Sequence, residues 1–191
     1  MGRRWRFVGR MATGLCALAV LALVFPFPFT DGGAPADAPR LAGQLVRHDG
    51  RPLAPGWTHG RAIVAYLGFI ACTDYCPRGL DRMASVLEKM PPARRPIGVF
   101  VTLEPENDSP QRLAEYLDAF GGGIVGVTGD PETMHPMTDA LRAAAARSGA
   151  DPLALLVLAP GGRLLGVVDG YRSAAEAAKA VALLSASDGR L

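Results

Sequence analysis

Two apolar runs rich in β-branched and aromatic residues are each followed by a segment of helical character, and this alternation constrains the fold most. The first run, RAIVAYLGFI at residues 61–70, precedes a segment at residues 77–90 in which apolar residues recur at helical spacing. The second run, at residues 96–103, precedes a helix that Ser109 and Pro110 open as N-cap and first helical residue. Strands that alternate with helices predict a largely parallel sheet that helices cover on both faces.

The rest of the chain continues this pattern. An Asp-Gly turn predicts a short hairpin at residues 45–53, and a Pro-Gly-Gly turn predicts another at residues 153–168. A short strand at residues 124–127 and a helix at residues 133–147 lie between them, and a helix closes the domain. Because the hairpins add antiparallel strands, the sequence predicts an α/β, thioredoxin-like sandwich at residues 41–191, with a central mixed sheet flanked by helices.

The N-terminus has the character of a membrane signal. Residues 11–29 carry no charge over 19 positions and follow four arginines. Such a run is long enough to cross a bilayer, and the arginines keep their own end in the cytoplasm. Two prolines near its end and the Ala-Pro-Ala sequence at residues 34–36 also fit a cleaved signal peptide. We therefore expect residues 1–29 to be a signal anchor or a signal peptide, and residues 30–40 to be a flexible linker.

Export determines the surroundings that we expect for the domain. The N-terminal signal predicts a single-pass protein of the bacterial cell membrane, with the domain on the periplasmic or extracytoplasmic side. Oxidising conditions there allow a disulfide between Cys72 and Cys76. The net charge of +2 comes from the N-terminal arginines, because residues 31–191 hold 16 basic and 18 acidic side chains. A nucleic-acid partner is therefore not expected.

Cys72 and Cys76 lie where the first predicted strand ends and the next helix begins. Open α/β sheets expose their reactive groups at this position. Two thiols this close can bind a soft metal such as Cu(I) or zinc, exchange with another disulfide, or form a structural disulfide. Because Cys76 stands beside Pro77 at the helix N-terminus, we expect the helix dipole to favour the thiolate of Cys76.

The stretch YLGFIACTDYCPRGL, residues 66–80, resembles the Sco/SenC family of membrane-anchored proteins with a thioredoxin fold. The family pattern reads Gly-Phe-Thr-x-Cys-Pro-Asp-x-Cys-Pro, and Ile70 and Thr73 depart from it. The chain matches it at Gly68, Phe69, Cys72, Asp74, Cys76 and Pro77. Residues 101–132 and the hairpin at residues 158–166 resemble further stretches of the family, so the similarity covers about residues 41–185.

This resemblance implies a role in assembly of the binuclear copper centre of cytochrome c oxidase, either by delivery of Cu(I) or by reduction of the cysteines at that site. In the family, both cysteines and one histidine hold the copper. Asp151 stands where that histidine is expected, nine residues before Pro160, and a carboxylate is at most a weak ligand for Cu(I). The following Pro152 fits either the cis-proline that faces the redox cysteines of thioredoxins or an ordinary turn.

His135 is the second weak candidate for a metal ligand, because Met134 and Met137 beside it are soft enough for Cu(I). Both methionines are equally suited to pack a helix against the core. The sequence thus leaves two hypotheses for the same pair of cysteines, a metallochaperone that binds Cu(I) and a thiol-disulfide oxidoreductase. The resemblance implies that the partner is the copper-bearing subunit of cytochrome c oxidase or another exported thiol protein.

Overall fold

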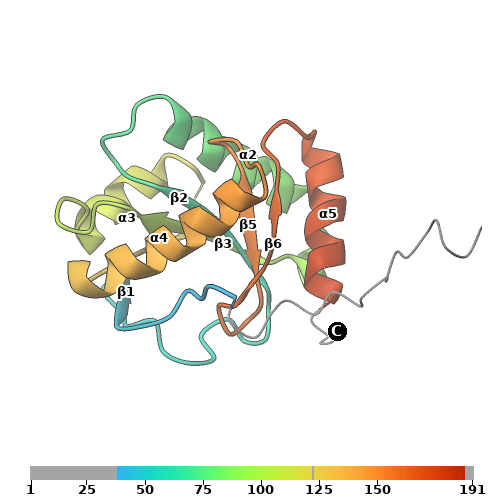
Figure 1. Cartoon of the computed structure of the whole chain (residues 1–191). Helices are drawn as coiled ribbons and strands as arrows, with labels where there is room; N and C mark the ends of the chain where they lie inside the picture. Colours follow the sequence, from blue (N-terminus) through green and yellow to red (C-terminus); the bar gives the residue numbers. More distant parts are fainter. Residues whose placement is uncertain (1–37, 122, 188–191) are drawn as a thin grey trace, which may run out of the picture. The chain divides into compact units, whose positions relative to one another are not determined.

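Six strands form one mixed sheet through the middle of the protein (Figure 1). They are β1 (Leu45–Arg47), β2 (Ile63–Gly68), β3 (Ile97–Thr102), β4 (Ile124–Gly129), β5 (Leu155–Leu158) and β6 (Leu164–Val168). Their order across the sheet is β1-β4-β3-β2-β5-β6. β2, β3 and β4 are parallel, whereas β1, β5 and β6 pair antiparallel with their neighbours. This computed structural model describes residues 38–121 and 123–187.

Helices cover both faces of the sheet (Figure 1). They are α2 (Tyr75–Glu88), α3 (Pro110–Asp118), α4 (Pro131–Arg147) and α5 (Ala174–Ala186), with a short 3₁₀ helix at Pro92–Arg94. α2, α3 and α5 pack on one face in a cluster that includes Leu80, Leu113 and Val181. α4 packs on the other face, where Met134 and Leu141 are fully buried. Successive residues of β2 and β3 point alternately into the two clusters, as expected for strands buried on both faces.

The predicted α/β architecture with a mixed sheet is confirmed, and the helix boundaries follow local side-chain chemistry. Ser109 caps α3 as expected. α4 starts at Pro131, two residues before its predicted start, because the side chain of Asp130 caps the helix there. α2 starts at Tyr75, so Cys76 lies inside its first turn and not just before the helix.

The predicted membrane segment lies outside the described residues. Residues 1–37, which include the apolar run and most of the linker, are not among them. Of the helices within residues 38–121 and 123–187, none is long and apolar enough to span a bilayer. The signal anchor or signal peptide at residues 1–29 and the linker at residues 30–40 therefore stay predictions.

β2 and α2 approach each other closely near the cysteines. A Cβ on Gly79 of α2 would lie 2.2 Å from Cζ of Tyr66 on β2. A Cβ on Gly68, at the end of β2, would lie 2.7 Å from Sγ of Cys76. Both distances are below 3.0 Å, so neither position accepts a side chain without movement of its neighbour. The two glycines therefore let the helix that carries Cys76 pack closely against β2.

Replacing Gly79 by Ala should lower the free energy of unfolding by about 1–3 kcal/mol, because the added methyl group overlaps the ring of Tyr66. The midpoint of urea unfolding measures this change, and it should fall while the m-value stays constant. Gly161→Ala is the matched control, because a Cβ at this exposed turn position has no neighbour within 4 Å. The control should change the free energy of unfolding by less than about 0.5 kcal/mol. Equal stability of the two variants would contradict the close approach of β2 and α2.

Candidate functional site

The two predicted cysteines come together at the carboxyl-terminal end of β2. Cys72 lies in the turn that joins β2 to α2, and it is partly exposed. Cys76 lies in the first turn of α2 and is 3% exposed, with its sulfur against Gly68. The backbone N–H of Cys76 donates a hydrogen bond to Sγ of Cys72 at 3.2 Å. Both cysteines are free thiols in this structure, and the Cys72–Cys76 disulfide stays a prediction.

Cys72 is the more acidic thiol of the pair. Burial alone would raise its pKa, but hydrogen bonds to the sulfur outweigh this effect and hold the pKa below its usual value. The donors are the thiol of Cys76 and the backbone N–H groups of Cys76, Asp74 and Tyr75. N–H groups at a helix N-terminus have no partner within the helix and carry the positive end of its dipole. A thiolate at Cys72 is therefore stabilised and accessible from solvent.

Cys76 is the protected thiol. Burial raises its pKa to about 12, and its hydrogen bond to the sulfur of Cys72 adds to the increase. The expectation that the helix N-terminus favours a thiolate at Cys76 is therefore wrong, because the effect falls on Cys72. The reason is geometric. Since α2 already begins at Tyr75, the first free N–H groups of the helix lie beside the preceding turn, where the sulfur of Cys72 is.

Two buried tyrosine hydroxyls lie beside the thiols. The sequence did not identify them as site residues, because each tyrosine stands in an apolar pattern that predicts only core packing. The hydroxyl of Tyr66 on β2 donates to the carbonyl oxygen of Pro152 at 2.9 Å and lies 3.2 Å from that of Tyr75. The hydroxyl of Tyr116 on α3 is buried without a hydrogen-bond partner among the described residues. Burial, followed by the charges of the two cysteines, raises the pKa of Tyr66 and raises that of Tyr116 to about 12. Both hydroxyls therefore stay protonated at neutral pH.

Asp108 joins the cysteine loop to the neighbouring loop. It is 1% exposed, and its Oδ2 accepts hydrogen bonds from the hydroxyl of Thr102 at 2.5 Å and from the N–H of Ile70 at 3.1 Å. Thr102 ends β3 and Ile70 follows β2, so this buried carboxylate fixes the spacing of the two strand ends. The sequence did carry a signal for it, because Asp108 falls within the family-like stretch at residues 101–132, directly before the cap of α3.

Asp151 is held by the backbone of two loops. Its Oδ1 accepts a hydrogen bond from the N–H of Leu153 at 2.7 Å, and its Oδ2 accepts one from the N–H of Gly170 at 2.6 Å. The carboxylate thus fastens the loop between β6 and α5 to the turn before β5. No cis peptide bond occurs in the described part of the chain, so Pro152 forms an ordinary turn and not a cis-proline. Asp151 acts here as a hydrogen-bond acceptor for the backbone.

His135 lies on α4, which covers the face of the sheet opposite to α2. Its Nε2 is 2.6 Å from Oε1 of Glu106, in an exposed pair. Met134 and Met137 are 0% and 9% exposed and belong to the core cluster beneath α4. The structure therefore does not bring these three residues together as a soft-metal site, and core packing accounts for both methionines.

Copper would find two sulfur ligands at this site. Within residues 38–121 and 123–187, no three His, Cys, Asp or Glu side chains come close enough together to hold a metal ion. Thiolates are the ligands that Cu(I) prefers, so the two cysteines fit it chemically. Asp151 and His135 both have other partners. The two thiols are thus sufficient for disulfide exchange, whereas for Cu(I) the described residues provide two sulfur ligands and no third ligand.

Cys72 should react with iodoacetamide much faster than Cys76, because only its thiolate is both stabilised and accessible. Peptide mass spectrometry after brief alkylation across about pH 6 to 9 measures both rates, and the rate at Cys72 should rise with an apparent pKa below that of a free cysteine. In Cys76→Ala, which removes the thiol donor, this rise should move to higher pH. Faster labelling of Cys76 in the unmodified domain would contradict the assignment.

Asp151→Ala should lower the free energy of unfolding by about 1–3 kcal/mol, because it leaves the N–H groups of Leu153 and Gly170 without their acceptor. Urea unfolding measures the change. Asp139→Ala is the matched control, since this carboxylate is exposed and 3.6 Å from Arg142, and it should cost less than about 0.5 kcal/mol. The Cu(I) affinity of the reduced, folded protein should be the same with and without Asp151→Ala. A loss of affinity would instead make Asp151 a copper ligand.

Comparison with known proteins supports the resemblance seen in the sequence. A family model described as SCO1/SenC matches residues 37–185. Protein sco1 of Schizosaccharomyces pombe is 35% identical over 49% of this chain and 37% of its own length. A putative copper-binding protein of Stutzerimonas stutzeri is 32% identical over 51% of this chain and 49% of its own length. The chain thus matches half or less of the length of these curated relatives.

Solved structures share the fold. Yeast Sco1 with copper bound has a TM-score of 0.63 at 24% identity, covering 78% of this chain and 92% of the yeast chain. Arabidopsis thaliana ScoI with copper bound has a TM-score of 0.61 at 20% identity, covering 73% of this chain and 93% of the plant chain. These similarities establish the thioredoxin-like fold of the described domain, and the family model extends over nearly all of that domain. The chain therefore belongs to the SCO1/SenC family.

Proposed function

We propose that this protein acts in assembly of the copper site of cytochrome c oxidase, as a thiol-disulfide oxidoreductase that uses Cys72 and Cys76. The observation that carries the proposal is the difference between the two sulfurs. Cys72 is partly exposed and has a lowered pKa, whereas Cys76 is buried and has a pKa of about 12. One accessible thiolate beside one protected thiol is the arrangement that disulfide exchange requires. Membership in the SCO1/SenC family supports the oxidase as the setting.

The reaction begins with the thiolate of Cys72. It attacks one sulfur of a partner disulfide, forms a mixed disulfide, and releases the other partner sulfur as a thiolate. The sulfur of Cys72 is then uncharged, so it no longer raises the pKa of Cys76 through its charge and its hydrogen bond. Cys76 gives its proton to the released thiolate and attacks Sγ of Cys72. This step forms the Cys72–Cys76 disulfide and releases the second partner sulfur, which takes its proton from water.

Tyr66 assists the second step. A hydrogen bond from its hydroxyl lowers the pKa of Cys76, against the larger effects of burial and of the Cys72 sulfur. The hydroxyl stays protonated, because burial and then the nearby cysteines raise the pKa of Tyr66 above its usual value. When the buried Cys76 thiolate forms, the hydroxyl turns its single proton from the carbonyl oxygen of Pro152 to the sulfur and so acts as a neutral donor.

Carriage of Cu(I) by the same two sulfurs is a second candidate function. It is favoured by the similarity to a relative described as a putative copper-binding protein and to family structures with copper bound. Copper is then the cargo, held between Sγ of Cys72 and Sγ of Cys76 without a histidine. Binding releases the proton of Cys76, and a site with two ligands passes its metal readily to a partner site with more ligands.

Both candidate functions require an exported domain. The uncharged run at residues 11–29, with arginines before it, supports a single-pass anchor in the bacterial cell membrane, with the domain on the periplasmic or extracytoplasmic side. The partner is the copper-bearing subunit of the oxidase or another exported thiol protein. It meets Cys72 at the end of β2, where the sulfur is accessible.

The purified domain, residues 38–191, tests the oxidoreductase function. Both buried clusters consist of residues between Leu41 and Val181, so this piece carries its whole core. Equilibration with glutathione should reveal one two-electron transition, which Cys72→Ser and Cys76→Ser both abolish. A peptide with a disulfide between two cysteines should be reduced by the domain, form a trapped mixed disulfide with Cys76→Ser, and not react with Cys72→Ser. The proposal fails if no mixed disulfide forms at Cys72.

Anaerobic titration with Cu(I) against a competing chelator separates the two functions. We expect the reduced domain to lose this competition, because it offers two sulfur ligands and must release the proton of Cys76. His135→Ala is a control for the alternative ligand and should change nothing. A single tight site that needs both cysteines would make copper carriage the function in place of disulfide exchange.

A further inference from the structure

At the end of the sheet opposite the cysteines, the chain enters the described domain from its N-terminal part. The N–H of Leu41 donates to the carbonyl oxygen of Gly162, and the N–H of Leu164 donates to that of Pro39, both at 2.8 Å. Residues 39–41 therefore run along the turn between β5 and β6. Because β5 is antiparallel to β2, this turn lies beside the start of β2, whereas Cys72 follows the end of β2.

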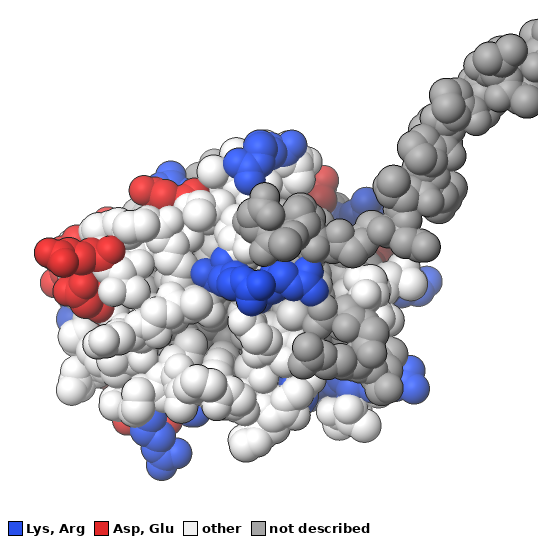
Figure 2. Space-filling model, turned by 60° about the horizontal axis from the view of Figure 1, so that its bottom comes forward, with Lys and Arg blue, Asp and Glu red and all other residues white. Residues whose placement is uncertain are grey.

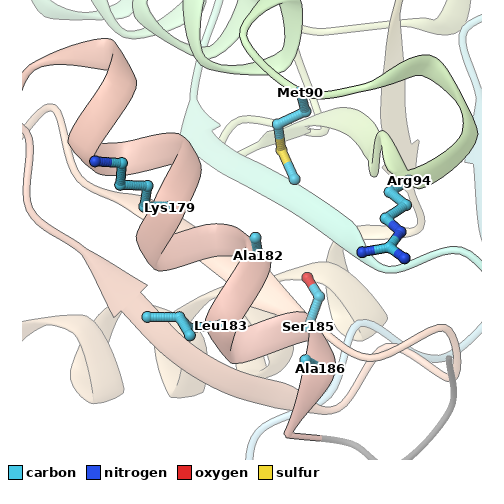
Figure 3. A pocket seen from close by; sticks show the side chains of 7 residues that line it. All are labelled: Met90, Arg94, Lys179, Ala182, Leu183, Ser185 and Ala186. Carbon is cyan, nitrogen blue, oxygen red and sulfur yellow. The ribbon is translucent and has the colours of Figure 1, made fainter.

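A groove lies at this end, between the C-terminal half of α5 and the segment that follows α2 (Figure 3). Its volume is about 450 Å³. Apolar side chains line it, namely Met90, Ala182, Leu183 and Ala186. Arg94 borders it from the 3₁₀ helix. Lys179 borders it from α5, with its amino group directed away from Arg94 in Figure 3. Leu183 is 74% exposed, although it is a large apolar side chain.

Exposed cations lie at the groove, at the entry of the chain and shortly before β2. Arg61 lies two residues before β2, Arg94 lies three residues before β3, and Arg40 lies where the chain enters. All three are exposed, as is Lys179. No ion pair found within residues 38–121 and 123–187 includes any of the four. Figure 2, which brings the lower side of Figure 1 forward, shows Lys and Arg across the middle of the surface and the largest group of Asp and Glu at one border. We call these four cations and Leu183 the tether edge.

The length of the preceding chain limits how far the tether edge can be from a membrane. The apolar run at residues 11–29 ends nine residues before Ala38. Nine fully extended residues span at most about 30 Å. An anchor at residues 11–29 therefore holds the tether edge near the bilayer surface. The cysteines lie at the other end of β2, whose six residues span about 20 Å.

We propose that the tether edge binds an anionic phospholipid surface. The four cations contact lipid phosphates, and Leu183 and the apolar groove take up the nonpolar part of the interface between headgroups and acyl chains. Such a surface complements the tether edge in two ways: its negative phosphates match the basic side chains, and its nonpolar layer matches the exposed apolar residue. Docking in this way turns Cys72 and Cys76 away from the bilayer, toward partner domains that project from the membrane. The proposal does not depend on which reaction the thiols perform.

Vesicle sedimentation of the domain, residues 38–191, tests this proposal. Vesicles of phosphatidylcholine alone are compared with vesicles that contain about one third phosphatidylglycerol. The domain should sediment with the anionic vesicles only, and its binding should weaken as salt is raised. Arg94→Glu/Lys179→Glu should weaken binding by at least about tenfold, because two attractive charges become repulsive. Leu183→Ser should weaken it by about threefold or more, because the apolar contribution is lost.

Arg78→Glu/Arg142→Glu is the matched control. It makes the same change in net charge at exposed arginines outside the tether edge, each 3.6 Å from a single aspartate. It should leave vesicle binding within about twofold of the unmodified domain. If the two double variants lost vesicle binding equally, net charge alone would explain the loss and the proposal would be overturned. Equal binding to both kinds of vesicle, or no binding to either, would also overturn the proposal. If the tether edge bound a purified oxidase subunit and not vesicles, it would be a protein contact.

Discussion

The contact between Tyr66 and Gly79 is the constraint on which the rest of the site depends. Because a Cβ on Gly79 would lie 2.2 Å from Cζ of Tyr66, α2 rests directly on the ring of this β2 residue at a position without a side chain of its own. The same approach places the sulfur of Cys76 against Gly68, where a Cβ would lie 2.7 Å away. The Tyr66 hydroxyl then emerges beside the turn before β5 and donates to Pro152 at 2.9 Å. One aromatic side chain therefore joins a strand, the helix that carries one thiol, and the turn where the family histidine is expected.

The turn before β5 gives a structural reason for an aspartate, and not a histidine, at residue 151. Asp151 accepts one hydrogen bond on each carboxylate oxygen, from Leu153 and from Gly170. A neutral imidazole has a single acceptor nitrogen, so histidine at this position could satisfy only one of the two N–H groups. A Cβ on Gly170 would lie 2.2 Å from Oδ1 of Asp151, which shows how tightly the two loops fit around the carboxylate. In this chain, the residue at the position where the resemblance places a histidine connects two loops.

The fold was predictable because local signals agreed with one another, whereas the properties of the site depend on contacts between elements. The cap at Ser109 and the apolar runs of the central strands each predict one structure, and the structure has it. The choice of the acidic thiol was not predictable in this way. An expected helix start at Pro77 assigns the dipole to Cys76, but the actual start at Tyr75 assigns it to Cys72. Boundaries are where sequence patterns are least exact, so a shift of two residues was enough to exchange the roles of the two sulfurs.

Disulfide exchange and Cu(I) binding make different demands on Cys76. Exchange needs only the thiolate of Cys72 at first. It relieves the hydrogen bond and the charge that add to the effect of burial in raising the pKa of Cys76. Coordination of Cu(I) by both sulfurs must displace the proton of Cys76, whose pKa is about 12, so copper affinity falls as pH falls toward neutrality. A third soft ligand would offset this cost, but Asp151 is held by backbone N–H groups and His135 pairs with Glu106. The high pKa of Cys76, and the lack of a third His, Cys, Asp or Glu ligand among the described residues, therefore weigh against tight retention of Cu(I) by this pair.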